Sequence, residues 1–128
     1  MTSFIEEAEG LVFELWQKQR SLVRQAMFWD AAGKVTVVAF PSAASREGSL
    51  GELARAAADL SPVRVAFFSE SSATNPRGEK IDVIVLELAD ARTSLYTQRI
   101  YTPAEPPVCV MDDTKPLATS PLATIVTT

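Results

Sequence analysis

Three strand-like runs follow one another between residues 63 and 102, and they constrain the fold of this chain more than any other feature. Val63–Ser69 alternates between two sets of side chains, as expected of a β-strand. Ile81–Leu88 is almost continuously apolar, which predicts a central strand that is covered on both faces. Ser94–Thr102 mixes apolar with polar and charged residues, which predicts an edge strand or a strand with one wet face. The three runs together predict a meander.

Two segments that precede the meander have the periodicity of helices. Apolar residues recur at helical spacing between residues 5 and 16, and again between residues 50 and 60. Ser3 and Ser49 each stand three residues before a glutamate, which is the capping-box pattern of a helix start. Pro62 ends the second helix because proline disfavours helical geometry in the residue before it.

The stretch between the two helices predicts a β-hairpin. Lys34–Phe40 is rich in β-branched residues and is stopped by Pro41, so it has the features of a strand. The residues 30–33 end in Gly33, which suits a turn, and the partner strand is then Val23–Trp29. In the alternative interpretation the first helix continues to Phe28.

This order of elements predicts an α+β fold. We expect a single domain with the order α-ββ-α-βββ, in which helices pack on a mainly antiparallel five-stranded sheet. If the first helix continues to Phe28, the prediction becomes an α-βαβββ mixed sheet. The hairpin, crossover helix and meander are similar in topology to the roadblock and longin type of fold. This similarity carries no motif and implies no function.

The last 26 residues differ in composition from the rest. Five of the eight prolines lie between residues 103 and 128, and charged residues are few there. We therefore expect a single α+β domain over residues 1–102, followed by an extended Pro-rich segment over 103–128. Short apolar runs in this segment are of a size to add a strand, and its sequence suits wrapping along a neighbouring surface or remaining flexible.

Composition excludes several classes of function. Histidine is absent, so the chain lacks Ser-His-Asp and Cys-His nucleophile systems and histidine-ligated metal sites. Neither a phosphate-binding glycine loop nor a G-x-S-x-G motif occurs. Cys109 is the only cysteine, and none of its neighbours would activate it. No cofactor is therefore predicted, and no catalytic or metal-binding residue can be assigned.

Charge and hydropathy narrow the partners and the location. The net charge of −4, without a basic stripe, argues against nucleic acid as a partner. No secretory signal and no apolar run long enough to span a membrane can be recognised, so we expect a cytoplasmic protein that does not bind membranes.

A few residues remain as candidates for ligand binding or for an interface. Carboxylates at the strand ends provide oxygen atoms of the kind that Mg²⁺ or Ca²⁺ prefers. Arg77 lies in a long polar loop over residues 70–80, which we expect to act as a lid if a site exists. Aromatic and basic side chains lie on the expected edge strand. The full set of candidates is Glu70, Arg77, Asp82, Glu87, Tyr96, Arg99 and Tyr101.

Two functional hypotheses follow. The first is a small non-enzymatic interaction or oligomeric module, which docks on a protein partner or on itself through the edge strand Ser94–Thr102 or the Pro-rich segment. The second is an enzyme that depends on a small ligand or a divalent metal and uses Glu70, Asp82 and Glu87. The lack of catalytic equipment favours the first.

Overall fold

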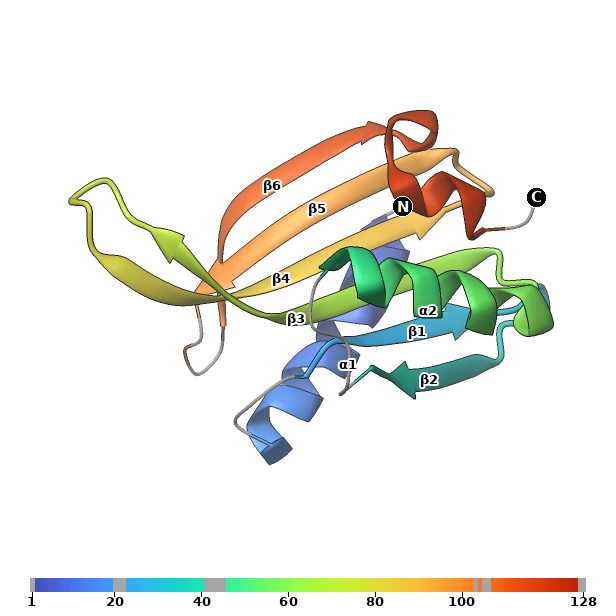
Figure 1. Cartoon of the computed structure of the whole chain (residues 1–128), viewed down its shortest axis with the longest axis horizontal. Helices are drawn as coiled ribbons and strands as arrows, with labels where there is room; N and C mark the ends of the chain where they lie inside the picture. The colour runs from blue at the N-terminus through green and yellow to red at the C-terminus, as the bar shows by residue number, and fades with distance from the viewer. Residues whose placement is uncertain (1, 20–22, 41–45, 103, 105–106, 127–128) are drawn as a thin grey trace.

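The computed structural model describes residues 2–19, 23–40, 46–102, 104 and 107–126. These residues form a single six-stranded sheet with one helix on each face (Figure 1). The elements are, in chain order, α1 (Thr2–Gln19), β1 (Gln25–Trp29), β2 (Val35–Ala39), α2 (Arg46–Leu60), β3 (Arg64–Thr74), β4 (Lys80–Asp90), β5 (Leu95–Thr102), β6 (Val108–Pro116) and two 3₁₀ turns at Leu117–Thr119 and Pro121–Thr124.

All neighbouring strands are antiparallel, and their order across the sheet is β2-β1-β3-β4-β5-β6. The α+β class is therefore confirmed, but the prediction of five strands is wrong. A sixth strand, β6, comes from the Pro-rich segment and pairs with β5. The prediction that Ser94–Thr102 forms an edge is also wrong, because β5 lies between β4 and β6. Of its polar residues, Arg99 contacts α1 and β6 and Thr97 contacts β6, so neither faces an open edge.

Residues 25–29 form a strand, so the alternative with a helix that continues to Phe28, and its mixed sheet, is wrong. Every residue of β1 is buried. Met27 and Trp29 point into the cluster beneath α1, whereas Phe28 points into the cluster beneath α2. Strand alternation thus buries three consecutive large side chains, which a helix would have pointed in three directions. Pro41, which was expected to stop the second strand, lies outside the described residues.

The helix α1 covers one face of the sheet. Its fully buried residues Phe4, Ala8 and Val12 recur every four positions and form one stripe. The Phe4 ring meets the Trp29 ring edge to face at 5.0 Å, and Trp29 Nε1 donates a hydrogen bond of 2.9 Å to Glu7. The stripe packs on residues of the four strands β1, β3, β4 and β5.

The opposite face is covered by two segments that are distant in sequence. Leu53 and Ala57 of α2 pack there on Phe28 and Phe67. Leu117, Leu122 and Ile125 from the end of the chain are buried in the same cluster, and Figure 1 shows their turns beside α2. The end of the chain thus contributes a strand and part of the cover of this face.

Both predicted capping boxes are wrong. The helix α1 begins at Thr2 and α2 at Arg46, so Ser3 and Ser49 lie within helices instead of preceding them. Ser49 is fully buried. For α2 the pattern failed because the helix begins at Arg46, four residues before Leu50, where its apolar periodicity starts.

The polar loop that was predicted over residues 70–80 is mostly β-structure. Strand β3 continues to Thr74 and β4 begins at Lys80, and Asn75 closes the turn by accepting backbone N–H groups through its side chain. Gly78 has a φ of +80°, which glycine adopts without strain. The outer part of this hairpin is not paired with β1 or β5 and projects from the sheet as an arm (Figure 1).

Candidate functional site

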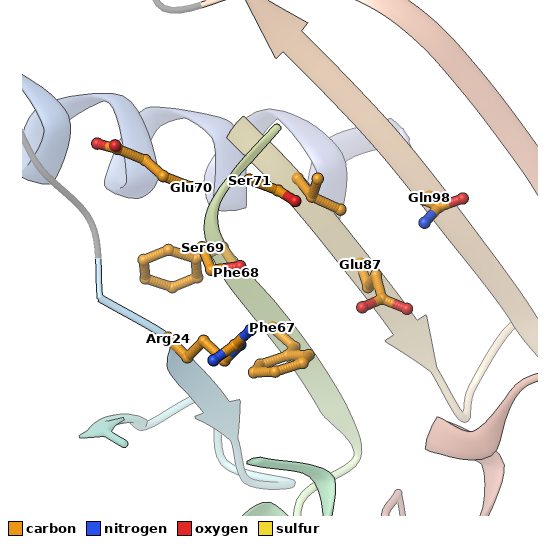
Figure 2. A pocket seen from close by; sticks show the side chains of 9 residues that line it. Arg24, Phe67, Phe68, Ser69, Glu70, Ser71, Glu87 and Gln98 are labelled. Carbon is orange, nitrogen blue, oxygen red and sulfur yellow. The ribbon is translucent and has the colours of Figure 1, made fainter. Parts of the chain in front are cut away.

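A pocket of about 230 Å³ opens on the face of the sheet that carries α2 (Figure 2). It lies where β3, β4 and β5 extend beyond the cover of that helix. Its lining combines polar, charged and aromatic side chains from four strands or their flanks: Arg24, Phe67, Phe68, Ser69, Glu70, Ser71, Val85, Glu87 and Gln98. Sequence analysis selected two of these residues, Glu70 and Glu87.

Glu87 is the most buried of the candidate residues with a carboxyl group. It lies on β4 opposite Phe67 and Gln98 and is 3 % exposed. Tyr96, two positions before Gln98 on β5, donates a hydrogen bond of 2.6 Å from its hydroxyl to Glu87 Oε1. Such a short bond to a carboxyl oxygen is of the stronger kind. It joins two residues that sequence analysis had selected separately, and it stabilises the junction of β4 with β5.

The other two carboxylates do not complete a site with Glu87. Phe67 of β3 is paired with Glu87 and lies on the same face of the sheet. Glu70 is three positions further along β3, so strand alternation directs it to the opposite face. Figure 2 shows it pointing away from Glu87. Asp82 is exposed on the arm, opposite Ser72. Within the described residues, no group of three side chains is placed to hold a metal ion.

Arg77, the remaining candidate in the predicted lid, is exposed in the turn at the tip of the arm. Its backbone N–H donates to the side chain of Asn75. The tip lies at the far end of the hairpin from the strands of the core (Figure 1).

Arg99 and Tyr101 form a polar cluster beneath α1. Arg99 donates from Nε to the Tyr101 hydroxyl at 2.8 Å, and its Nη1 lies 2.6 Å from Asp112 on β6. Its Nη2 is 4.0 Å from Glu9 of α1. The Tyr101 ring is 1 % exposed and meets the Phe13 ring at 5.1 Å. One guanidinium therefore connects β5 with β6 and with α1.

Burial raises the pKa of the Tyr101 hydroxyl well above its ordinary value of about 10; the hydrogen bond from Arg99 opposes this shift and Glu9 adds to it. Burial disfavours the charge of Arg99, but the hydrogen bond to Tyr101 and the neighbouring negative groups raise the pKa of the guanidinium above its ordinary value. Both groups therefore keep their protons at neutral pH. This behaviour suits a structural link between the strands and α1.

The two edges of the sheet differ in chemistry. Strand β6 contains the acidic residues Asp112 and Asp113, together with Lys115 and Pro116. Its register with β5 is interrupted near Ile100. Charges, proline and a register shift are the features by which proteins prevent an edge from pairing with another strand. Strand β2, with the sequence VTVVA, has none of them.

An apolar groove lies beside the unprotected edge. It has a volume of about 330 Å³ and separates α1 from β2. Val37, at the centre of β2, is 52 % exposed although it is a large apolar residue. The lining residues are Glu7, Leu11, Glu14, Leu15, Lys18, Met27, Val35 and Val37. Sequence analysis did not select this edge, although the signal was present as a run of β-branched residues without a charge.

Comparisons with protein-family models, with curated proteins and with solved structures found no match. The similarity to the roadblock and longin type of fold thus stays an expectation from topology. Of the helices in the described part of the chain, none is both long and apolar enough to cross a membrane.

Proposed function

We propose that this protein is a non-enzymatic interaction module and that β2 is the strand on which its protein partner docks. The observation that carries the proposal is the contrast between the two edges. The β6 edge has protective features, whereas β2 is β-branched, uncharged and bordered by an apolar groove. An exposed edge of this kind accepts an extended segment through main-chain hydrogen bonds, and the neighbouring pockets select its side chains.

The backbone of β2 supports this proposal. Phe40 N–H donates to Arg24 O at 2.8 Å, and Asp30 N–H donates to Lys34 O at 3.0 Å. These two bonds set the parity of the β1–β2 ladder, in which the even-numbered residues of β2 bond to β1. The N–H and C=O groups of Val35, Val37 and Ala39 therefore point away from the sheet.

The side chains of the same three residues support it as well. Val35 and Val37 lie opposite Trp29 and Met27, whose side chains enter the cluster beneath α1. They consequently lie on the face of the groove. A docked strand gains hydrogen bonds along the edge and apolar contacts in the groove at the same time. The alternative of a metal- or ligand-dependent enzyme has less support, because strand alternation places Glu70 and Asp82 on the opposite face of the sheet from Glu87.

The proposal is tested by placing a photo-crosslinking amino acid at Val37 in the full chain, in its native cells. The matched control carries the same amino acid at Val108, which is 54 % exposed on the other edge. We expect cross-linked protein from position 37 and much less from position 108. A partner identified in this way, once purified, must slow hydrogen exchange of the outward amides of Val35, Val37 and Ala39. Equal cross-linking at both edges, or unchanged exchange, would overturn the proposal.

A further inference from the structure

We infer that the strand which docks on β2 is β2 of a second copy of this chain, in antiparallel register about a two-fold axis at Val37. This inference rests on the proposed function and names its partner. It follows from the backbone parity, the side-chain chemistry and the charge of the edge.

The outward backbone groups of β2 are self-complementary. They belong to Val35, Val37 and Ala39, which are spaced evenly about the central valine. A two-fold axis there places Val37 opposite its symmetry mate and Val35 opposite the Ala39 of the other copy. Each of the three resulting pairs exchanges two N–H···O bonds, so about six hydrogen bonds form without any change of the strand. The two sheets then become one continuous sheet.

The side chains match in the same register. On the α1 face, valine meets valine at the axis and Val35 meets Ala39. On the α2 face, Thr36 meets Val38. Each is a β-branched or small pair, and cross-strand pairs of this kind stabilise a sheet. A shift by one residue would instead place inward-pointing backbone groups against outward-pointing ones, so only shifts by an even number of residues keep the hydrogen bonds. Of these registers, the one about Val37 pairs all three outward residues of both copies.

The charge distribution permits two like copies to meet at this edge. Each chain has a net charge of −4, so two copies repel each other at long range. Strand β2 has no charged residue, and no like charges are therefore brought face to face at the axis. On the helix beside it, Lys18 Nζ lies 3.0 Å from Glu14, so these two charges at the groove are paired within one copy.

The groove supplies the contact area that a short strand lacks. A stable interface buries about 800 Å² on each partner, more than five paired residues provide. The two-fold axis runs perpendicular to the sheet, so both copies present α1 on the same side. The C-terminal end of α1 projects past the β1–β2 side of the sheet (Figure 1). Leu11 and Leu15 of each copy, which line the groove, then face the apolar edge of the other copy.

The test is a charge-swap experiment at the axis, read by sedimentation velocity from low to high micromolar concentration. We expect a dimer for the unmodified chain and at least roughly tenfold weaker association for either V37K or V37E, since like charges then meet at the axis. An equimolar mixture of V37K and V37E must form a heterodimer, because residue 37 of one copy meets residue 37 of the other. The control V108K, on the opposite edge, must associate like the unmodified chain.

Circular dichroism of each variant shows that loss of association is not loss of folding. If the unmodified chain is monomeric at all concentrations, or if the mixture does not recover the dimer, the second copy is the wrong partner or the register is wrong. The cross-linking at Val37 then distinguishes a failure of self-pairing from a failure of the proposed interaction module. A different protein captured there, with the outward amides protected, leaves the interaction module standing and overturns only self-pairing. No capture overturns both.

Discussion

Removal of the Tyr96 hydroxyl is expected to lower the free energy of unfolding by about 1.5–3 kcal/mol. Tyr96→Phe keeps the ring, which packs against the cluster beneath α2, and deletes the atom that donates to Glu87 at 2.6 Å. Glu87 is 3 % exposed, so water has little access to replace the lost donor. The magnitude is that of a hydrogen bond to a charged acceptor, which is larger than the typical value of about 1 kcal/mol.

Urea unfolding followed by tryptophan fluorescence measures this loss. We expect the midpoint to fall with an unchanged slope, because the variant exposes the same surface on unfolding. For a chain of this size, a loss of 2 kcal/mol corresponds to a decrease of roughly 6–10 °C in the melting temperature. Combining Tyr96→Phe with Glu87→Gln should give a coupling energy of about 0.5–3 kcal/mol, as expected for residues in contact.

The matched control is Thr119→Val. Thr119 also donates from its hydroxyl, to Pro116 O at 2.8 Å, but it is exposed and water replaces the bond. Its loss should lie within about 0.5 kcal/mol. If Tyr96→Phe costs no more than this control, Glu87 does not depend on Tyr96 and the reasoning from burial is refuted.

Three further predictions concern other contacts. Burial raises the pKa of Tyr101 in the folded state, so its contribution to stability is complete below about pH 10 and is lost as the pH rises further. The unfolding free energy, measured between about pH 8 and 11, should therefore fall more steeply for the native chain than for Tyr101→Phe. Arg64→Met leaves the fully buried Asp90 carboxyl without the donor at 3.1 Å, and urea titration should show a loss of about 1.5–3 kcal/mol in the free energy of unfolding. A neutral result would mean that the other donor to Asp90, the backbone N–H of Arg92, is sufficient. Lys18→Ala removes an ion pair in which both side chains are more than half exposed, and the same titration should detect no more than about 0.5 kcal/mol; a larger loss would contradict the view that the pair is solvated.

The elements of the fold were largely accessible from local patterns. Helical periodicity predicted both helices. A run of β-branched residues predicted β2, alternation predicted the first part of β3, and a continuous apolar run predicted most of β4. Local patterns were less informative about boundaries. The polar sequence over residues 70–80 has the composition of a loop, yet most of it pairs in a hairpin arm, because backbone hydrogen bonds across the strands do not depend on apolar side chains.

The candidate residues show a similar division. Glu87 and Tyr96 were selected separately, and the structure joins them by a hydrogen bond. Arg99 and Tyr101 were selected as features of an edge, whereas they lie beneath α1 and connect it to two strands. Their roles depend on the strand β6 on the far side of β5, and the sequence left open whether the Pro-rich segment would pair there.

The sequence by itself determined the α+β class, the order of the first helices and strands, and the lack of histidine chemistry, since these follow from periodicity and composition. Only the tertiary structure decided that the Pro-rich segment supplies the sixth strand and that the exposed edges are β2 and β6. The physical reason is that a strand's neighbours are set by backbone hydrogen bonds to other segments, which the side-chain pattern of one segment does not specify. Which row of backbone groups is left unpaired, and thus open to a partner, becomes visible only when the whole sheet is assembled.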